Sequence, residues 1–370
     1  MHILILNWKD IKNPAKGGAE VIAFEFASRL VKKGHKVTFF SRDFPGALKE
    51  EDINGVHVVR RGNMLTVYFE AFFYYKSLRI KPDRVIDMVN TICWQTPLYV
   101  PKDKRVFYVN QLAQEVFFYE LPKPLSWIMY SLEWLEYITY KNTKALCYSK
   151  STKNDLISFG IPEKNISIFP MGLDHSRYKP FGKKNENPLF VFVARLVHMK
   201  RADLCIKAIA LLKKNYPTIK LAIIGNGPEE NNLIDLTRKL HLENNVILVN
   251  KNNFFLSKKS HDIKIDYMRK SWALLLPSVK EGWGMVVTEA AACGTPAIVS
   301  DVTGLRDSVV ANKTGIILSS NPTKESLAEA IEKMMDKNIR ESYSENAIVW
   351  SKNFDWDQSF KKFYQLILPQ

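Results

Sequence analysis

Short apolar segments alternate with longer segments of helical periodicity along almost the whole chain. In the first half, segments typical of strands fall at 3–6, 36–40, 56–59, 84–86, 106–109 and 145–147. A second series falls at 189–193, 221–224, 246–249, 273–276, 297–299 and 315–318. Strands that alternate with helices form parallel sheets, because each crossover helix returns the chain to the same end of the sheet. The sequence therefore predicts an α/β protein with two Rossmann-like sheets.

The boundary between the two series is marked by turn-forming residues. Glycine and proline punctuate the segment from Pro170 to Gly182, and the polar residues 183–187 follow it. A chain of 370 residues is also long enough for two domains. We expect domains at 1–175 and 176–352, and an amphipathic helix at 353–370 whose apolar face could dock on either domain.

Composition favours a cytoplasmic chain with reduced thiols. Hydrophobic residues make up 46% and charged residues 25%, which suits well-packed cores. The four cysteines are scattered without metal or redox spacing. The first seven residues are too short an apolar run for a signal peptide, and no run approaches the roughly 18 apolar residues of a membrane span.

The net charge of +15 is spread over both halves of the chain. Lys+Arg minus Asp+Glu gives 26 − 18 = +8 for residues 1–182 and 27 − 20 = +7 for residues 183–370. Nucleic-acid binders usually concentrate their charge, so this spread argues against that class. An anionic small molecule or an anionic membrane surface is a more suitable partner. A generally basic composition without a dedicated partner explains the charge equally well.

Two cations follow the first strand of the second series. Arg195 and Lys200 lie where that strand should end, and ligands of doubly wound sheets bind at this edge. A guanidinium fork and a mobile ammonium together suit a diphosphate. The alternative is a solvated basic loop, because Arg201 follows directly.

Two carboxylates flank a glycine-rich turn later in this series. Glu281 precedes the turn, and Glu289 lies in the helix expected at 285–292. Glu281 can accept hydrogen bonds from a sugar, and Glu289 can hold ribose hydroxyls. A hydrolase acid/base couple is less suited to this spacing, and Glu289 lies too far along the helix to cap it. Backbone amides for a phosphate are expected from Gly282, Trp283, Gly284, Met285 and Val286.

Glycine pairs open two other helices. Gly17 and Gly18 follow the first strand, where the backbone can approach a phosphate or sugar, although a tight turn is an equal alternative. The third glycine of a dinucleotide fingerprint is missing, which disfavours NAD. Gly225 and Gly227 form a similar turn that would line the nucleotide side of a cleft.

Aromatic residues gather in two segments of the first half, 68–75 and 127–137. Trp127, Tyr130, Trp134 and Tyr137 recur at helical spacing. The favoured interpretation is a packed helix layer that covers a sheet. The alternative is an interfacial membrane surface or a surface for a lipid acceptor.

Jointly, these motifs resemble the retaining GT-B glycosyltransferases of family 4. The resemblance covers nearly the whole chain and rests mainly on Glu281 and Glu289 with the Arg195/Lys200 pair. It extends to Gly17-Gly18-x-Glu20, Pro170-x-Gly172-x-Asp174, Gly225-x-Gly227 and Gly294-Thr295-Pro296.

The resemblance implies two Rossmann-like domains that face each other across a cleft, with the helix at 353–370 packed back on the first domain. The second domain would bind a nucleoside-diphosphate sugar as donor substrate, and the first a glycan, lipid-linked or small-molecule acceptor. Arg195 and Lys200 would neutralise the diphosphate, Glu289 would hold the ribose, and Glu281 with the 282–286 amides would hold the sugar and phosphates. No cofactor and no divalent metal are implied.

Two departures from the family pattern leave alternatives open. Family members commonly carry a histidine beside the donor sugar where this chain has Asn110, which can hydrogen-bond a hydroxyl but cannot take a positive charge. A Lys/Asn-rich loop at 250–260 replaces a short glycine turn, which leaves the nucleobase open. The alternatives are a nucleotide-sugar epimerase and a catalytically weakened nucleotide-sugar-binding or nucleic-acid-binding protein.

Overall fold

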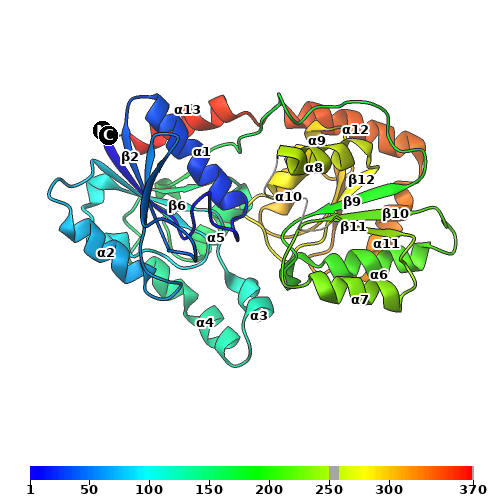
Figure 1. Ribbon diagram of the computed structural model, residues 1–370, viewed down its shortest axis with the longest axis horizontal. Coiled ribbons are helices and arrows are strands. Elements are labelled where there is room, and N and C mark those ends of the chain that lie inside the picture. Colours follow the sequence, from blue (N-terminus) through cyan, green and yellow to red (C-terminus); the bar gives the residue numbers. More distant parts are fainter. Residues whose placement is uncertain (250–257, 369–370) are drawn as a thin grey trace. The chain divides into compact units, whose positions relative to one another are not determined.

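The computed structural model describes residues 1–249 and 258–368, which fold into two compact units. Unit 1 contains Met1–Phe117, Lys123–Gly172 and Asp357–Gln370; unit 2 contains Phe118–Pro122 and Leu173–Trp356. Figure 1 shows that each unit is a sheet with helices packed along it.

Unit 1 contains an eight-stranded sheet of order β3-β4-β2-β1-β5-β6-β7-β8. Its strands are β1 (His2–Leu6), β2 (Lys36–Ser41), β3 (Glu50–Ile53), β4 (Val56–Arg60), β5 (Arg84–Val89), β6 (Arg105–Val109), β7 (Ala145–Cys147) and β8 (Ile166–Ile168). All neighbours are parallel except β3, which runs antiparallel to β4. Its helices are α1 (Gly18–Lys32), α2 (Val67–Ser77), α4 (Leu125–Ile138), α5 (Lys150–Ser158) and α13 (Trp356–Ile367); η1 (Thr96–Leu98), η2 (Lys102–Lys104), η3 (Gln114–Val116) and η4 (Glu163–Asn165) are single turns. The single turn α3 (Phe117–Glu120) begins at the last residue of the first segment of unit 1 and otherwise belongs to unit 2.

Unit 2 contains a six-stranded parallel sheet of order β11-β10-β9-β12-β13-β14. Its strands are β9 (Leu189–Val193), β10 (Lys220–Ile224), β11 (Val246–Val249), β12 (Ala273–Leu276), β13 (Ala297–Ser300) and β14 (Gly315–Leu318). Its helices are α6 (Ala202–Leu212), α7 (Glu230–Lys239), α8 (Lys258–Lys270), α9 (Met285–Ala292), α10 (Leu305–Ser308), α11 (Lys324–Lys333) and α12 (Lys337–Ser351), with the single turn η5 (His198–Lys200).

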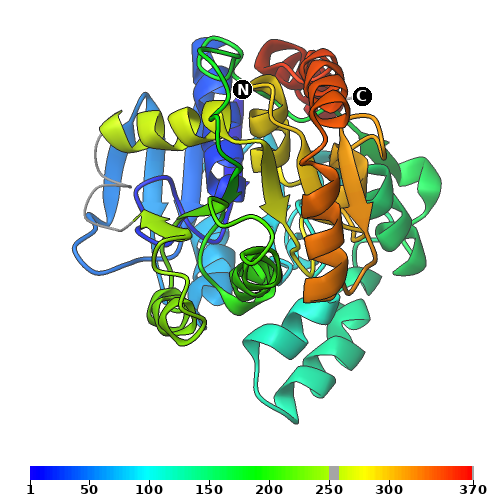
Figure 2. The same ribbon diagram turned by 90° about the vertical axis from the view of Figure 1, so that its right-hand side faces the viewer.

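The central strands are continuous apolar runs because helices cover both faces of a parallel sheet. Every residue of β9 and β12 is buried. In unit 2, α6 (green) packs beside α11 (orange), as Figure 2 shows. Burial on both faces explains why these strands could be recognised in the sequence as unbroken apolar segments.

One strand of unit 1, β3, was not predicted from the sequence and runs antiparallel to its neighbour β4. This strand has the sequence EEDI, alternates between exposed and half-buried residues, and lies at the edge of the sheet. Asn54 and Gly55 join it to β4, and both have positive φ (52° and 79°). An Asn-Gly pair is a strong signal for a two-residue hairpin turn, and this signal could have revealed the strand.

The C-terminal helix α13 packs within unit 1. Phe363 stacks on Phe26 of α1 with a ring separation of 4.3 Å, and Ser359 Oγ donates to the Pro170 carbonyl at 2.7 Å. Asp357 forms an ion pair with Arg29. In Figure 1, α13 (red) lies beside α1 (blue).

A buried carboxyl links β5 to the segments that follow it. Asp87 is fully buried, and its Oδ2 accepts hydrogen bonds from Thr96 Oγ1 at 2.7 Å and from the Tyr140 hydroxyl. Burial raises the pKa of Asp87 to about 6, against the opposing effect of these hydrogen bonds. The folded chain therefore binds a proton at this site over a pH range in which the unfolded chain does not.

We expect this carboxyl to make the chain less stable as the pH rises. Between the ordinary pKa of 3.8 and about 6 the folded state binds more protons, so the free energy of unfolding falls through that window. A pKa shift of this size changes the free energy of unfolding by about 3 kcal/mol at most. Asp87→Asn should remove this dependence because an amide side chain does not titrate. Its oxygen can still accept the hydrogen bonds from Thr96 and Tyr140. Urea titrations of the wild type and of Asp87→Asn at about pH 4 and about pH 7 measure this dependence. The same change of stability with pH in both proteins would contradict the prediction.

Candidate functional site

Three neighbouring strands of unit 2 bring the predicted residues to one edge of the sheet. β9 lies between β10 and β12, all parallel, so the loops that follow them emerge together. The loop after β9 carries Arg195 and Lys200, the loop after β10 carries Gly225 and Gly227, and the segment after β12 leads to Glu281. The Val279 amide donates to the Met199 carbonyl at 2.9 Å, which joins the first and third segments.

Lys200 and Glu281 form an ion pair that the sequence reasoning missed. Lys200 Nζ lies 2.5 Å from Glu281 Oε1, and the two side chains are 14% and 16% exposed. Ser278 Oγ donates to the same oxygen at 3.1 Å. The two residues, assigned separately to the diphosphate and to the sugar, thus form one charged cluster. A ligand phosphate at Lys200 would compete with Glu281 for the ammonium.

The two arginines of the loop after β9 have different environments. Arg195 is exposed. Arg201 has a positive φ of 56°, and its guanidinium donates to Asn321 Oδ1 and the Pro322 carbonyl, each at 3.0 Å. Arg201 therefore ties the start of α6 to a neighbouring loop, which leaves Arg195 as the solvent-accessible guanidinium of the pair.

Gly225 and Gly227 allow two loops to approach closely. A Cβ atom on Gly225 would lie 1.9 Å from the Ala194 carbonyl oxygen, and one on Gly227 would lie 2.2 Å from the Leu196 carbonyl oxygen. The Leu196 amide also donates to the Asn226 carbonyl at 2.8 Å. These glycines shape the loop that carries Arg195, which is a packing reason for a motif that the sequence analysis interpreted as a ligand-lining turn.

The turn at residues 281–284 leads directly into α9, which begins at Met285 as predicted. Gly284 has φ +82°, and a Cβ there would lie 2.6 Å from Leu305 Cδ2. A Cβ on Gly304 would lie 2.3 Å from the Glu281 carbonyl oxygen, so this later glycine, which the sequence analysis did not single out, also shapes the turn. The first amides of α9, those of Met285 and Val286 among them, lack intrahelical acceptors and carry the positive end of the helix dipole.

Trp283 contributes to the core of unit 2. Its side chain is 7% exposed, and its ring centroid lies 5.2 Å from that of Phe354. At Gly282 and Trp283, this turn can therefore offer an anion only backbone amides. That these amides bind an anion, as expected from the sequence, stays a prediction.

Glu289 is held by a lysine that was not anticipated. It lies in α9, is 7% exposed and forms an ion pair with Lys264 of α8. Lys264 Nζ also lies 3.1 Å from the Tyr178 hydroxyl. Burial, followed by the nearby Glu289 charge, raises the pKa of Tyr178 and keeps its hydroxyl neutral. Of the Asn/Lys-rich loop predicted at 250–260, residues 250–257 lie outside the described residues, and 258–260 are instead the start of α8.

In unit 1, the predicted glycine loop is held by polar contacts. The Gly17 amide donates to Glu20 Oε2 at 2.5 Å. Lys9 Nζ donates to the Ala15 carbonyl at 2.6 Å and lies 3.8 Å from Glu20. The Gly17 amide is thus engaged within α1's own first turn, and Gly18 is the first residue of the helix.

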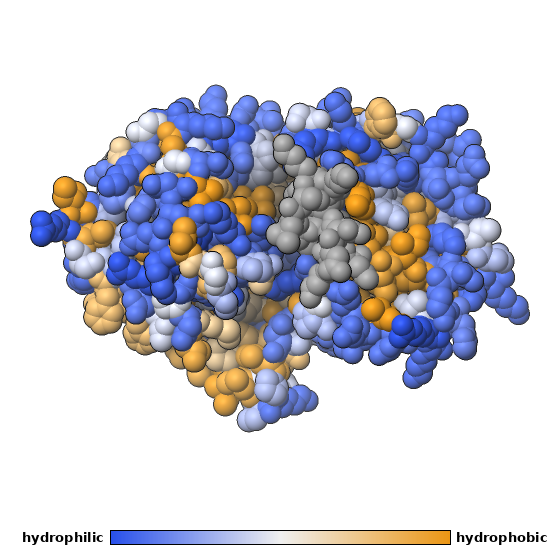
Figure 3. All heavy atoms as spheres, viewed as in Figure 1, coloured by the Kyte–Doolittle hydropathy of each residue, from blue (hydrophilic) through white to orange (hydrophobic). Residues whose placement is uncertain are grey.

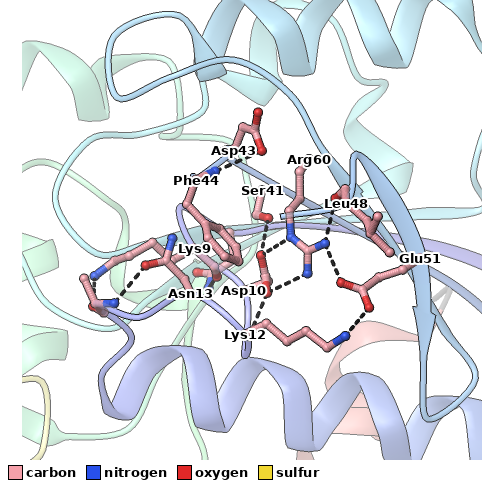
Figure 4. A network of polar contacts seen from close by, with 12 residues as sticks. Lys9, Asp10, Lys12, Asn13, Ser41, Asp43, Phe44, Leu48, Glu51 and Arg60 are labelled. Carbon is pink, nitrogen blue, oxygen red and sulfur yellow. Dashed lines mark hydrogen bonds and ion pairs between the residues drawn. The ribbon is translucent and has the colours of Figure 1, made fainter. Parts of the chain in front are cut away.

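A buried ion-pair network fixes the start of the same loop (Figure 4). The Arg60 guanidinium is fully buried and binds both oxygens of Asp10, at 2.7 and 3.0 Å. It also donates to Glu51 at 2.6 Å and to the Leu48 carbonyl at 2.8 Å. The Lys12 amide donates to Asp10 at 2.8 Å. Every nitrogen of the guanidinium has a partner, which compensates its burial.

Asn110 lies directly after β6 and is 7% exposed. Its backbone amide donates to the Val89 carbonyl at 2.9 Å, and its side-chain Nδ2 lies 3.3 Å from the same oxygen. The side-chain carbonyl oxygen of Asn110 is therefore the atom that it can present as an acceptor.

Two family models match the chain in succession. Residues 16–177 match Glycosyltransferase Family 4, and residues 176–350 match Glycosyl transferases group 1. An uncharacterized glycosyltransferase of Methanocaldococcus jannaschii is 26% identical over 98% of this chain and 96% of its own length.

Solved structures share the fold over the full chain. Sucrose-phosphate synthase from Thermosynechococcus elongatus matches with a TM-score of 0.80 at 18% identity, covering 99% of this chain and 98% of its own. HepE from Anabaena, solved in complex with UDP and glucose, matches with a TM-score of 0.71 at 16% identity, with the same coverage of 99% and 98%.

Proposed function

Because this chain belongs to the group 1 glycosyltransferases and has their GT-B fold of two Rossmann-like units, we propose that it is a retaining hexosyltransferase. Its donor is a nucleoside-diphosphate sugar, and its acceptor is a hydroxyl of a glycan or lipid-linked molecule. The observation that carries this proposal is the cluster at one sheet edge of unit 2. There, Arg195, the Lys200–Glu281 pair and the start of α9 lie on loops from adjacent strands.

The cluster offers a separate binding group to each part of a nucleotide sugar. Arg195 and Lys200 bind the diphosphate, assisted by the amides at the start of α9. Glu281 accepts hydrogen bonds from the sugar, and its ion pair with Lys200 orients this carboxylate. Glu289, already held by Lys264, accepts the ribose hydroxyls. The UDP and glucose bound by HepE, which has the same fold, support a donor of this class.

The proposed reaction retains the configuration of the anomeric carbon. The bond from this carbon to the diphosphate oxygen breaks, and the acceptor oxygen forms its bond on the same face. Because the acceptor attacks on the face from which the diphosphate leaves, no enzymic nucleophile is needed, and because the acceptor proton passes to the leaving diphosphate, no separate enzymic base is needed. Arg195, Lys200 and the α9 dipole stabilise the departing charge in the role that a divalent metal has elsewhere.

Asn110 is proposed as a hydrogen-bonding residue in place of a histidine. An amide can accept from a sugar hydroxyl but cannot share a proton or a developing charge. A nucleotide-sugar epimerase is not favoured, since both family models that match the chain are of glycosyltransferases.

A thermal-shift panel tests the donor class. One of UDP, GDP or ADP, or its sugar, should raise the melting temperature, because a ligand at 100 times its Kd stabilises the folded chain by about 2.7 kcal/mol. The shift should persist in EDTA, since the proposed site uses side-chain cations. Incubation of the stabilising sugar nucleotide with lipid or glycan acceptors then tests transfer. If no nucleotide stabilises the chain, the proposal of a nucleotide-sugar site in unit 2 is wrong.

A further inference from the structure

Helix α4 of unit 1 has the reverse of the usual polarity of a surface helix. The structure describes Leu125–Ile138 throughout, and no exposed side chain in it is charged. Eight of its large apolar side chains are between 40% and 55% exposed: Leu125, Trp127, Ile128, Tyr130, Leu132, Trp134, Leu135 and Ile138. For Trp127, Tyr130 and Trp134 the favoured interpretation of a packed helix layer is therefore wrong, whereas Tyr137 is fully buried.

The two acidic residues of α4 face the protein instead of the solvent. Glu133 is 1% exposed, and its two carboxylate oxygens accept the amides of Ala113 and Gln114 at 2.6 and 2.7 Å. Glu136 accepts the Cys93 amide at 2.8 Å, and burial raises its pKa. The two carboxylates therefore hold the helix against unit 1 through backbone amides, and most of its apolar side chains point outward.

Unit 1 has further exposed apolar side chains on α2 and η1. Phe69 and Phe73 of α2 are 69% and 63% exposed, and Leu98 of η1 is 70% exposed. Hydrogen bonds join the η1 segment to the end of α4: Gln95 Nε2 donates to the Glu136 carbonyl at 3.1 Å, and Thr139 Oγ1 donates to Gln95 Oε1 at 2.9 Å. Figure 3 shows the hydrophobic colouring over α4, at the lower edge of the view.

The residues at the two ends of α4 identify the kind of surface that it fits. Lys123 precedes the helix and Lys141 follows it, and both are exposed. Tryptophan and tyrosine prefer the boundary between lipid headgroups and acyl chains, where their rings are apolar and their polar tips stay wet. A helix with aromatic and aliphatic side chains outward and a lysine at each end suits an anionic bilayer surface. A second copy of this chain that paired through its own α4 would offer no negative charge to Lys123 and Lys141, because Glu133 and Glu136 both face inward.

We propose that α4 docks unit 1 on an anionic membrane. The helix lies in the plane of the interface, with Trp127 and Trp134 inserted at the headgroup boundary and Lys123 and Lys141 near anionic headgroups. At 14 residues it spans about 21 Å and lies on the bilayer, since the described chain contains no helix long and apolar enough to cross one. On the proposed function, this docking makes a lipid-linked acceptor the substrate class.

Vesicle flotation tests the docking without any sugar donor. Vesicles of equal parts phosphatidylcholine and phosphatidylglycerol should bind the chain, and pure phosphatidylcholine vesicles should bind it more weakly. Trp127→Gln/Trp134→Gln should lower the partition coefficient at least about tenfold, because two inserted aromatic rings are lost. Binding should also fall as salt rises above about 0.1 M. The matched control is Leu48→Gln/Phe181→Gln, which removes two apolar side chains that are 64% and 75% exposed elsewhere and should leave binding unchanged.

A second variant locates the inserted segment. Trp127→Phe/Trp134→Phe should still bind, but quenching of tryptophan fluorescence by brominated phosphatidylcholine should be lost. Equal vesicle binding by the wild type and the glutamine variant would overturn the proposal, as would no binding to anionic vesicles. A dimer in light scattering that only the glutamine variant loses, without vesicle binding, would assign α4 to a second copy. Nucleotide-induced thermal shifts should be the same in all variants, so failure of docking is distinct from failure of the donor site.

Discussion

Arg195→Met and Lys200→Met are each expected to weaken binding of the bare nucleoside diphosphate by about 10- to 100-fold, since each removes charged hydrogen bonds worth about 1.5–3 kcal/mol. The larger loss is expected for Lys200→Met. Glu281, whose side chain is 16% exposed and lies 2.5 Å from Lys200, would then face the diphosphate as an uncompensated carboxylate. Isothermal titration calorimetry with the nucleotide selected by the thermal-shift panel measures both affinities.

The control for these variants is a cation of the same unit outside the site. Lys207 of α6 is paired with Asp203 at 2.7 Å, and its side chain is 42% exposed. Lys207→Met removes the same charge and should change the affinity by less than about twofold. A comparable loss in this variant would mean that the general positive charge attracts the nucleotide. Unchanged affinity in both Arg195→Met and Lys200→Met would remove the diphosphate from this site.

Glu281→Gln and Glu289→Gln are expected to separate transfer from nucleotide binding. Glu281→Gln should lower kcat/KM by about 10- to 100-fold through a lost charged hydrogen bond to the sugar. It should leave the affinity for the bare diphosphate unchanged or higher, because Lys200 loses its competing partner. Glu289→Gln should instead weaken binding of the bare nucleoside diphosphate, because the ribose is part of that ligand. Calorimetry and initial rates on the same preparations give both quantities.

Lys264→Met provides the matched control for Glu289. It breaks the same ion pair but keeps the carboxylate. If Glu289 binds ribose, this variant should retain nucleotide affinity that Glu289→Gln loses. Equal losses in the two variants would assign Glu289 a structural role. If Glu281→Gln and Glu289→Gln both bind and transfer normally, the assignment of these carboxylates to the donor is incorrect.

A double-mutant cycle of Lys200→Met and Glu281→Gln measures the coupling of this pair. The two changes should not be additive, because each single variant leaves the other charge without its partner at a half-buried site. This coupling could not be derived from the sequence, where the two residues lie 81 positions apart.

The strands and their order of appearance could be predicted well because parallel strands buried on both faces need unbroken apolar segments. β7, β9, β11, β12 and β14 have the predicted bounds, and α9 begins at the predicted residue. Two edge strands of unit 1 were not predicted. β3 can be acidic because one of its faces is exposed, and its signal lay in the Asn54-Gly55 turn. β8 has only three residues, too few to show a strand pattern.

The sequence by itself determined that Arg195, Lys200, Glu281 and Gly225 would share one edge of a sheet, because parallel connections place all loops after the strands at the same end. Tertiary structure alone decided their partners: Glu281 with Lys200, and Glu289 with Lys264. Helical spacing likewise placed Trp127, Trp134 and Tyr137 on one helix. Periodicity cannot tell which side of a helix meets the core when nearly every side is apolar. In α4 that choice was made by Glu133 and Glu136, whose inward hydrogen bonds to the backbone turn the tryptophans to the outside.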